Sequence, residues 1–267
     1  MRAAAAAIRT LAEGPEWPLL AVAGLAWAVL LVAERIPGAP PVCATGAVDP
    51  IVLAQFWLSS FAAWTGPVTL FAALIAMPVA MTAPLLQAPL GHVRQSALHE
   101  RRARAVALFL MGHVCAWAVS VAVLMGLAFG LGRLVSFPVA ATGLAVAAGL
   151  VWQGTPYKVI ARNLSHVRAP LPACGVRADT AVLRYGAQSA AYCSASCWPL
   201  MLAPMTSGPS HLAMTAAAAA LMLCERTARP IGAVARWRWI GAGLAVGACV
   251  VTGILVWTPN PQTGAPG

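Results

Sequence analysis

Long runs of apolar residues, separated by short polar segments, dominate the chain. A helix that crosses a membrane needs about 20 mostly apolar residues. Seven stretches reach or approach that length, and we predict a membrane helix over each: 17–34, 67–89, 105–132, 134–154, 182–206, 209–225 and 239–258. The pattern predicts an all-α integral membrane protein, a polytopic helical bundle of about seven transmembrane helices.

One membrane domain over residues 17–258 is expected between two short ends. Residues 1–16 are expected to form a cytoplasmic N-terminal segment, and the Pro/Gly-rich tail 259–267 is expected to be disordered. Arg2 and Arg9 before the first apolar run resemble the start of a signal peptide. That run is long and lacks a clean small-x-small cleavage site, so we interpret it as a retained anchor.

The placement of the cations predicts the topology. The chain has 17 Lys+Arg against 7 Asp+Glu, a net charge of +10, although only 9% of its residues are charged. With the N-terminus inside, fifteen of the seventeen cations fall in cytoplasmic segments, and 155–181 becomes the longest internal loop. Cytoplasmic loops of membrane proteins carry excess Lys and Arg. We therefore predict a multi-pass protein of the cell inner (cytoplasmic) membrane, embedded in the lipid bilayer.

Several classes of function find no support in the sequence. The basic residues are not interleaved with stacking aromatics, so no nucleic-acid partner is expected. The chain has no phosphate-binding P-loop, no H-E-x-x-H and no G-x-S-x-G motif. No carboxylate lies deep in a predicted span, and Glu225 with Arg226, at the end of the sixth, is interpreted as an anchoring pair. We do not expect an enzyme.

Sulfur side chains recur every fourth residue along the fifth predicted helix: Cys193, Cys197, Met201 and Met205. Residues four apart share one face of a helix. Thiolates and thioethers prefer soft ions such as Cu(I). However, Met also fills gaps in cores, and a free Cys behaves as a small buried hydrophobe. The spacing alone therefore leaves metal binding and packing as alternatives.

Depth arithmetic extends this pattern to a second helix. At 1.5 Å per residue, Cys197 and Cys193 lie about 14 and 20 Å below the outer end of their helix. Met77 and Met81 fall about 15 and 21 Å down the second predicted helix. We predict a mid-membrane metal site of these four residues if the helices are neighbours. The outer ends of the fifth and sixth helices predict a second site: Met201, Met205, His211 and Met214.

Four short motifs follow one another along the chain. They are Met77-x-x-Ala80-Met81-x-x-Pro84, Gln153-x-Thr155-Pro156-x-Lys158, Arg168-x-Pro170-Leu171, and Cys193-x-x-x-Cys197-Trp198-x-Leu200-Met201 followed by Gly208 and Glu225. In this order they resemble the DUF2182 family of predicted metal-binding integral membrane proteins. Thr82 and Ser196 stand where that family has a further Met and Cys. The resemblance covers roughly 67–230 in pieces and implies a metal role without naming the metal.

The leading hypothesis is a membrane-embedded protein that binds copper as Cu(I) and acts in copper handling, delivery or transport. Its partner would be a copper-carrying protein or another membrane protein. A structural or assembly subunit of a larger membrane complex, with no metal of its own, is the alternative. A redox-active dithiol is a third, although the spacing of Cys193 and Cys197 makes a disulfide awkward without unwinding. The sequence leaves the direction of transport and the oligomeric state open.

Overall fold

The computed structural model describes residues 17–33 and 35, 75–135, 138–207, 210–227 and several positions between 238 and 246. Every secondary-structure element in these ranges is helical, so the predicted all-α class is confirmed for them. In chain order they are α2 (Trp17–Ala33), a helix over 75–82, the 3₁₀ helix η2 (Ala83–Leu86), α5 (Gln87–Ser96), η3 (His99–Arg101), α6 (Arg102–Leu134), α7 (Pro138–Gln153), α8 (Pro156–Leu164), α9 (Val176–Thr206) and α10 (His211–Thr227), with a further helical stretch at 238–240.

Helices occupy five of the predicted spans: 17–34, 105–132, 134–154, 182–206 and 209–225. Among the described helices, the segment from His99 to Leu134 is long and apolar enough to cross a membrane by length and composition. Three further apolar helices, within α2, α7 and α10, are shorter than that. A bundle of seven spans therefore stays a prediction.

Two segments differ in detail from the pattern that the sequence predicts. Span 67–89 is not one α-helix where it is described, because the helix over 75–82 gives way to η2 and then to α5. Pro84 lies in the first turn of η2, where its missing N–H is harmless, whereas inside an α-helix it would break a hydrogen bond. The internal loop predicted over 155–181 contains α8 and the first turns of α9.

The predicted N-terminal segment 1–16, residues 67–74 of the second span and the tail 259–267 lie outside the described residues. The seventh predicted span, 239–258, lies largely outside them. The single domain predicted over 17–258 is therefore described only in its central part.

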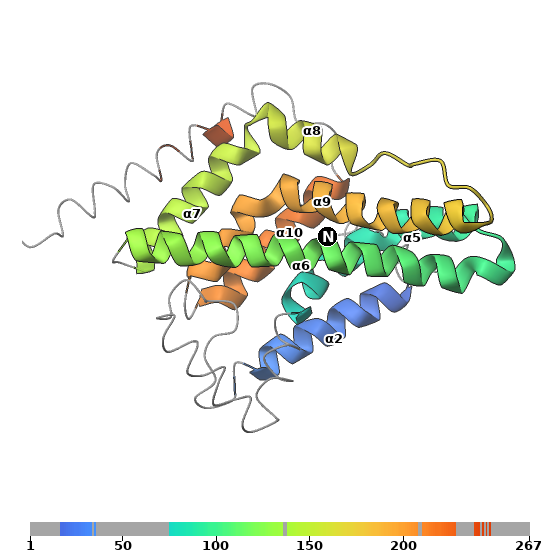
Figure 1. The fold of residues 1–267 in the computed structure, drawn as a ribbon. Coiled ribbons are helices and arrows are strands. Elements are labelled where there is room, and N and C mark those ends of the chain that lie inside the picture. Colours follow the sequence, from blue (N-terminus) through green and yellow to red (C-terminus); the bar gives the residue numbers. More distant parts are fainter. Residues whose placement is uncertain are drawn as a thin grey trace, which may run out of the picture.

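Helix α9 is the centre of the described bundle, with contacts to α6, α7, α8 and α10 (Figure 1). Its most extensive contact is with α6, where the two backbones meet at glycines. A Cβ on Gly112 would lie 2.1 Å from the carbonyl oxygen of Leu183, and one on Gly186 would lie 2.1 Å from that of Phe109. The absence of a side chain at both positions permits this close approach and fixes α9 against α6.

Helix α7 holds the other end of α9, which contains Pro199 and Pro204. The Thr142 hydroxyl donates to the carbonyl of Thr206, 2.9 Å away, and the indole of Trp152 donates to that of Ser196, 3.2 Å away. The last carbonyls of a helix have no partner within it, so the bond from Thr142 satisfies one that the helix leaves open.

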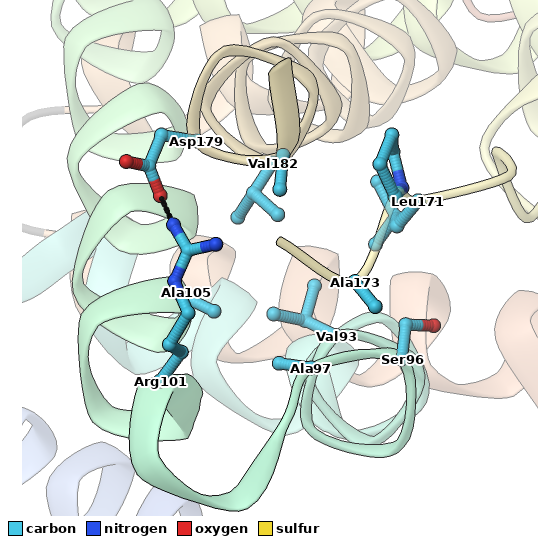
Figure 2. A pocket seen from close by; sticks show the side chains of 11 residues that line it. Val93, Ser96, Ala97, Arg101, Ala105, Leu171, Ala173, Asp179 and Val182 are labelled. Carbon is cyan, nitrogen blue, oxygen red and sulfur yellow. Dashed lines mark hydrogen bonds and ion pairs between the residues drawn. The ribbon is translucent and has the colours of Figure 1, made fainter. Parts of the chain in front are cut away.

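The N-terminal ends of α6 and α9 carry an ion-pair network that we call the exposed triad: Arg101, Arg104 and Asp179. The two guanidinium groups lie 2.6 and 2.7 Å from separate oxygens of the Asp179 carboxylate. Figure 2 shows Arg101 reaching Asp179 at the edge of a small pocket between α5, α6 and α9. Leu171, from the loop that precedes α9, lines the same pocket. The Arg104 side chain is 67% exposed, so solvent screens much of this network.

Candidate metal centre and its charged neighbours

Seven sulfur side chains belong to one continuous cluster of buried residues, which we call the sulfur cluster. Its members come from the helix over 75–82, from α9 and from α10: Met77, Met81, Cys193, Cys197, Met201, Met205 and Met222. Cys197 and Met201 are each 1% exposed, so their sulfur atoms have no access to bulk solvent. The tertiary fold thus gathers soft donors from segments far apart in the sequence.

The four-residue spacing on α9 brings sulfur atoms within reach of a single ion. Cys197 Sγ lies 3.9 Å from Met201 Sδ and 3.0 Å from the carbonyl oxygen of Cys193. Two sulfurs that each bind an ion at about 2.3 Å lie no more than about 4.6 Å apart. This donor set therefore fits a soft ion such as Cu(I).

The described residues contain no group of three or more His, Cys, Asp and Glu side chains that would hold a metal ion. The candidate donors in this part of the chain are accordingly two thiols and the neighbouring thioethers.

The predicted mid-membrane residues do share one environment. Met77 and Met81 are 4% and 2% exposed, and they lie in the same cluster as the two cysteines. Their role as ligands stays a prediction.

Only some residues of the predicted outer metal site belong to the sulfur cluster. Met205 is 4% exposed and belongs to the sulfur cluster, and His211, the first residue of α10, is 3% exposed. Met214 is only partly buried and lies outside that cluster. An outer site that includes His211 and Met214 stays a prediction.

Met222 is a member of the sulfur cluster that the sequence analysis missed. It lies eleven residues into α10, about 17 Å from the helix start, while Cys193 lies about 20 Å from the end of α9. The same depth arithmetic, applied to the sixth predicted span, would have placed Met222 beside Cys193.

A second group of charges, which we call the buried triad, lies beside the sulfur cluster: Lys158, Arg162 and Glu225. Lys158 Nζ lies 2.7 Å from the Glu225 carboxylate, and the exposed fractions of Lys158 and Arg162 are 3% and 9%. Glu225 pairs with Lys158, whereas the side chain of Arg226 lies outside the described residues, so the anchoring pair of Glu225 with Arg226 stays a prediction. The sequence pattern predicts Lys158 and Arg162 only as cations of an internal loop.

Helix α8 positions these cations by turning its polar face inward. Thr155 caps its start by accepting a hydrogen bond from the backbone N–H of Lys158, and Pro156 occupies the first turn. Lys158 and Arg162, four residues apart, share the buried face. The opposite face exposes apolar side chains: Tyr157, Ile160 and Leu164.

A small pocket joins the buried triad to the cysteines. It is lined by Leu85, Arg162, Ser165, Cys193, Ser196, Met222 and Glu225. Arg162 therefore faces the same space as the inner cysteine, and the structure shows no ion pair to its guanidinium among the described residues.

The environment of Lys158 makes its charge depend on Glu225. Burial lowers the pKa of the Lys158 ammonium from its ordinary value, while the Glu225 carboxylate opposes that shift through charge and a hydrogen bond.

A family model described as PpoB2, copper chaperone, matches residues 71–251, which is more than half of the chain. DUF2182 is the older name of that family, so the resemblance seen in the short motifs leads to the same family. The matched range includes the whole sulfur cluster and the buried triad. No curated protein and no solved structure matches the chain.

Proposed function

The chain belongs to the PpoB2 copper chaperone family, and from that premise we propose that it binds Cu(I) within the membrane and acts in copper handling, delivery or transport. The role is binding and transfer, not catalysis. Cys193 and Cys197 are the primary ligands, and Met201 is the nearest thioether. A copper-carrying protein or another membrane protein receives or supplies the ion.

The observation that carries this proposal is the 3.9 Å separation of Cys197 Sγ and Met201 Sδ, in a pair 1% exposed. Buried thiols next to thioethers also occur as ordinary packing, but their separation here matches the preference of Cu(I) for soft donors. Met77, Met81 and Met222 are further thioethers in the same buried cluster.

The length of the sulfur stripe suggests how the ion moves. Cys193 and Met205 are separated by about 18 Å along α9, too far for one ion to touch both. Copper would pass between neighbouring sulfurs by ligand exchange, with thiolates holding it firmly and thioethers passing it on. His211 and Met214 would serve the outer end of that path.

Two features of the surface support insertion in a membrane. Helix α6 exposes apolar side chains along its length, including Val114, Val119 and Val123. Helix α8 is reversed relative to a soluble protein, with its cations inside and Tyr157 and Ile160 outside. Exposed apolar faces and inward-facing charges are typical of membrane proteins. With the cation distribution, they support a seven-span inner-membrane protein whose N-terminus is cytoplasmic.

Metal content of the detergent-purified protein, reconstituted anaerobically with Cu(I), tests the proposal. We expect about one or two coppers per chain and a clear reduction in the Cys193→Ser/Cys197→Ser double variant. Cys115→Ser/Cys224→Ser is the matched control, because both of these cysteines are exposed. Equal copper in the two double variants would overturn the proposed ligands. No copper in the folded wild type would favour the structural or assembly subunit.

A further inference from the structure

The buried triad carries an excess positive charge that nothing described in the structure neutralises. Lys158 and Glu225 cancel each other across 2.7 Å, which leaves the guanidinium of Arg162. That side chain is 9% exposed, and it lines the same pocket as Cys193. No guanidinium nitrogen of Arg162 is a buried polar atom without a partner, but a cation that lines the same pocket as Cys193 favours a negative charge there.

The proposed metal site would supply one negative charge. Binding one Cu(I) to Cys193 and Cys197 replaces both thiol protons, which leave to solvent, and two thiolates with one monovalent ion carry a net charge of −1. No electron is transferred in this step. The charge of the buried triad is +1, so the copper-loaded site and the triad together are neutral.

A divalent ion would not balance in this way. Two thiolates with Zn(II) or Cd(II) are neutral, and the triad would then keep its +1 beside a filled metal site. The electrostatic cost of that uncompensated positive charge is large where the site is buried and the effective dielectric constant is low.

We infer that Arg162 is a selectivity determinant that favours a monovalent soft cation, Cu(I) or Ag(I), over a divalent one at the cysteine pair. The inference rests on the proposed function, because it takes Cys193 and Cys197 as the ligands. Arg162 acts through charge and does not touch the ion. Lys158 and Glu225 keep the triad at +1, since removing either partner alone changes that sum.

The test compares affinities for Cu(I) and Cd(II) in the full-length detergent-solubilised protein, each measured anaerobically by competition with a chelator of known affinity. In Arg162→Gln we expect the Cu(I) affinity to fall about tenfold while the Cd(II) affinity holds or rises. Arg162→Lys should restore the ratio. Arg104→Gln is the matched control, since it removes one positive charge from the exposed triad and should change neither affinity.

A purely structural role for Arg162 gives a different result. Equal losses for both ions, or no change for either, would overturn the inference while leaving copper binding by the cysteines intact. A wild-type protein that binds no Cu(I) would instead overturn the proposed function, and the inference with it.

A second pair of variants tests the same charge sum without changing Arg162. Lys158→Met lowers the charge of the triad by one and should shift the Cu(I)-to-Cd(II) ratio as Arg162→Gln does. Lys158→Met/Glu225→Gln leaves that charge at +1 and should keep the wild-type ratio. The same ratio in both variants would overturn the inference.

Discussion

The exposed triad and the buried triad have the same composition, two cations and one carboxylate, but their cations differ in exposure. The side chains of Arg101 and Arg104 are 25% and 67% exposed, whereas Lys158 and Arg162 are 3% and 9% exposed. In the exposed triad both arginines contact Asp179, at 2.6 and 2.7 Å, near the ends of α6 and α9. In the buried triad only Lys158 contacts Glu225, and Arg162 faces the pocket beside Cys193 instead.

Comparing the two ion-pair networks indicates which of them has a role other than stabilising the fold. Exposed ion pairs contribute little, about 0–1 kcal/mol, and are common on surfaces. A buried pair is more often neutral or unfavourable compared with apolar residues of the same size. The proposed metal–thiolate site, which would be anionic, would give the extra cation of the buried triad a function, because Arg162 lines the pocket beside Cys193.

The largest expected effect comes from breaking the buried pair. Lys158→Met should lower the free energy of unfolding by about 3–5 kcal/mol, because Glu225 would remain buried without its partner. Denaturant titration in mixed micelles measures this effect. Lys158→Met/Glu225→Gln should recover most of the loss. Little change in the single variant would mean that the buried triad is as solvated as the exposed one.

Binding of copper should stabilise the folded protein through the site beside the buried triad and should not depend on the exposed triad. Cu(I) at 100 times its dissociation constant should stabilise the folded protein by about 2.7 kcal/mol, because it binds the native state. A thermal shift in detergent, with and without Cu(I), gives the measurement. The shift should persist in Asp179→Asn and disappear in Cys193→Ser/Cys197→Ser. A shift that survives loss of both thiols would place the stabilising ion elsewhere.

The contact between α6 and α9, which positions the exposed triad, should be sensitive to a single methyl group. Gly186→Ala would place its Cβ 2.1 Å from the carbonyl oxygen of Phe109, so α6 and α9 must move apart. We expect a loss of about 1–3 kcal/mol in the unfolding titration. Gly126→Ala is the control, since a Cβ there meets nothing within 4 Å. Equal stability of the two variants would contradict the close approach.

The smallest effect should follow from removing the carboxylate of the exposed triad. Asp179→Asn is expected to lower the free energy of unfolding by about 1 kcal/mol or less, since Arg101 and Arg104 remain partly solvated. The remaining loss should shrink further in high salt, which screens exposed charges. A loss as large as that of Lys158→Met would remove the distinction between the triads.

Much of the candidate site followed from sequence spacing. The stripe from Cys193 to Met201 on α9 was predictable because residues four apart on a helix share a face. Met77 and Met81 are buried in the same cluster as the cysteines, and the matching depth that the spacing predicts stays a prediction. Met222 was missed only because that arithmetic stopped at the outer end of the sixth span.

The charged half of the site was not predictable in the same way. A cation in a segment rich in Arg is normally a solvated loop residue, so Lys158 and Arg162 were assigned to a loop. Their burial depends on α8 turning its polar face toward α9 and α10, which is a tertiary contact. No local pattern encodes the pairing of Lys158 with Glu225, 67 residues away.

The sequence by itself determined the helical character of the chain, its apolar segments and the sulfur spacing of α9, because these depend on periodicity and composition along one chain. The tertiary structure alone decided which distant residues meet. It broke the second predicted span at η2, paired α6 with α9 through Gly112 and Gly186, and brought Arg162 to the pocket beside Cys193. Close packing and burial of charge depend on what lies across an interface, and that information does not reside in any single segment.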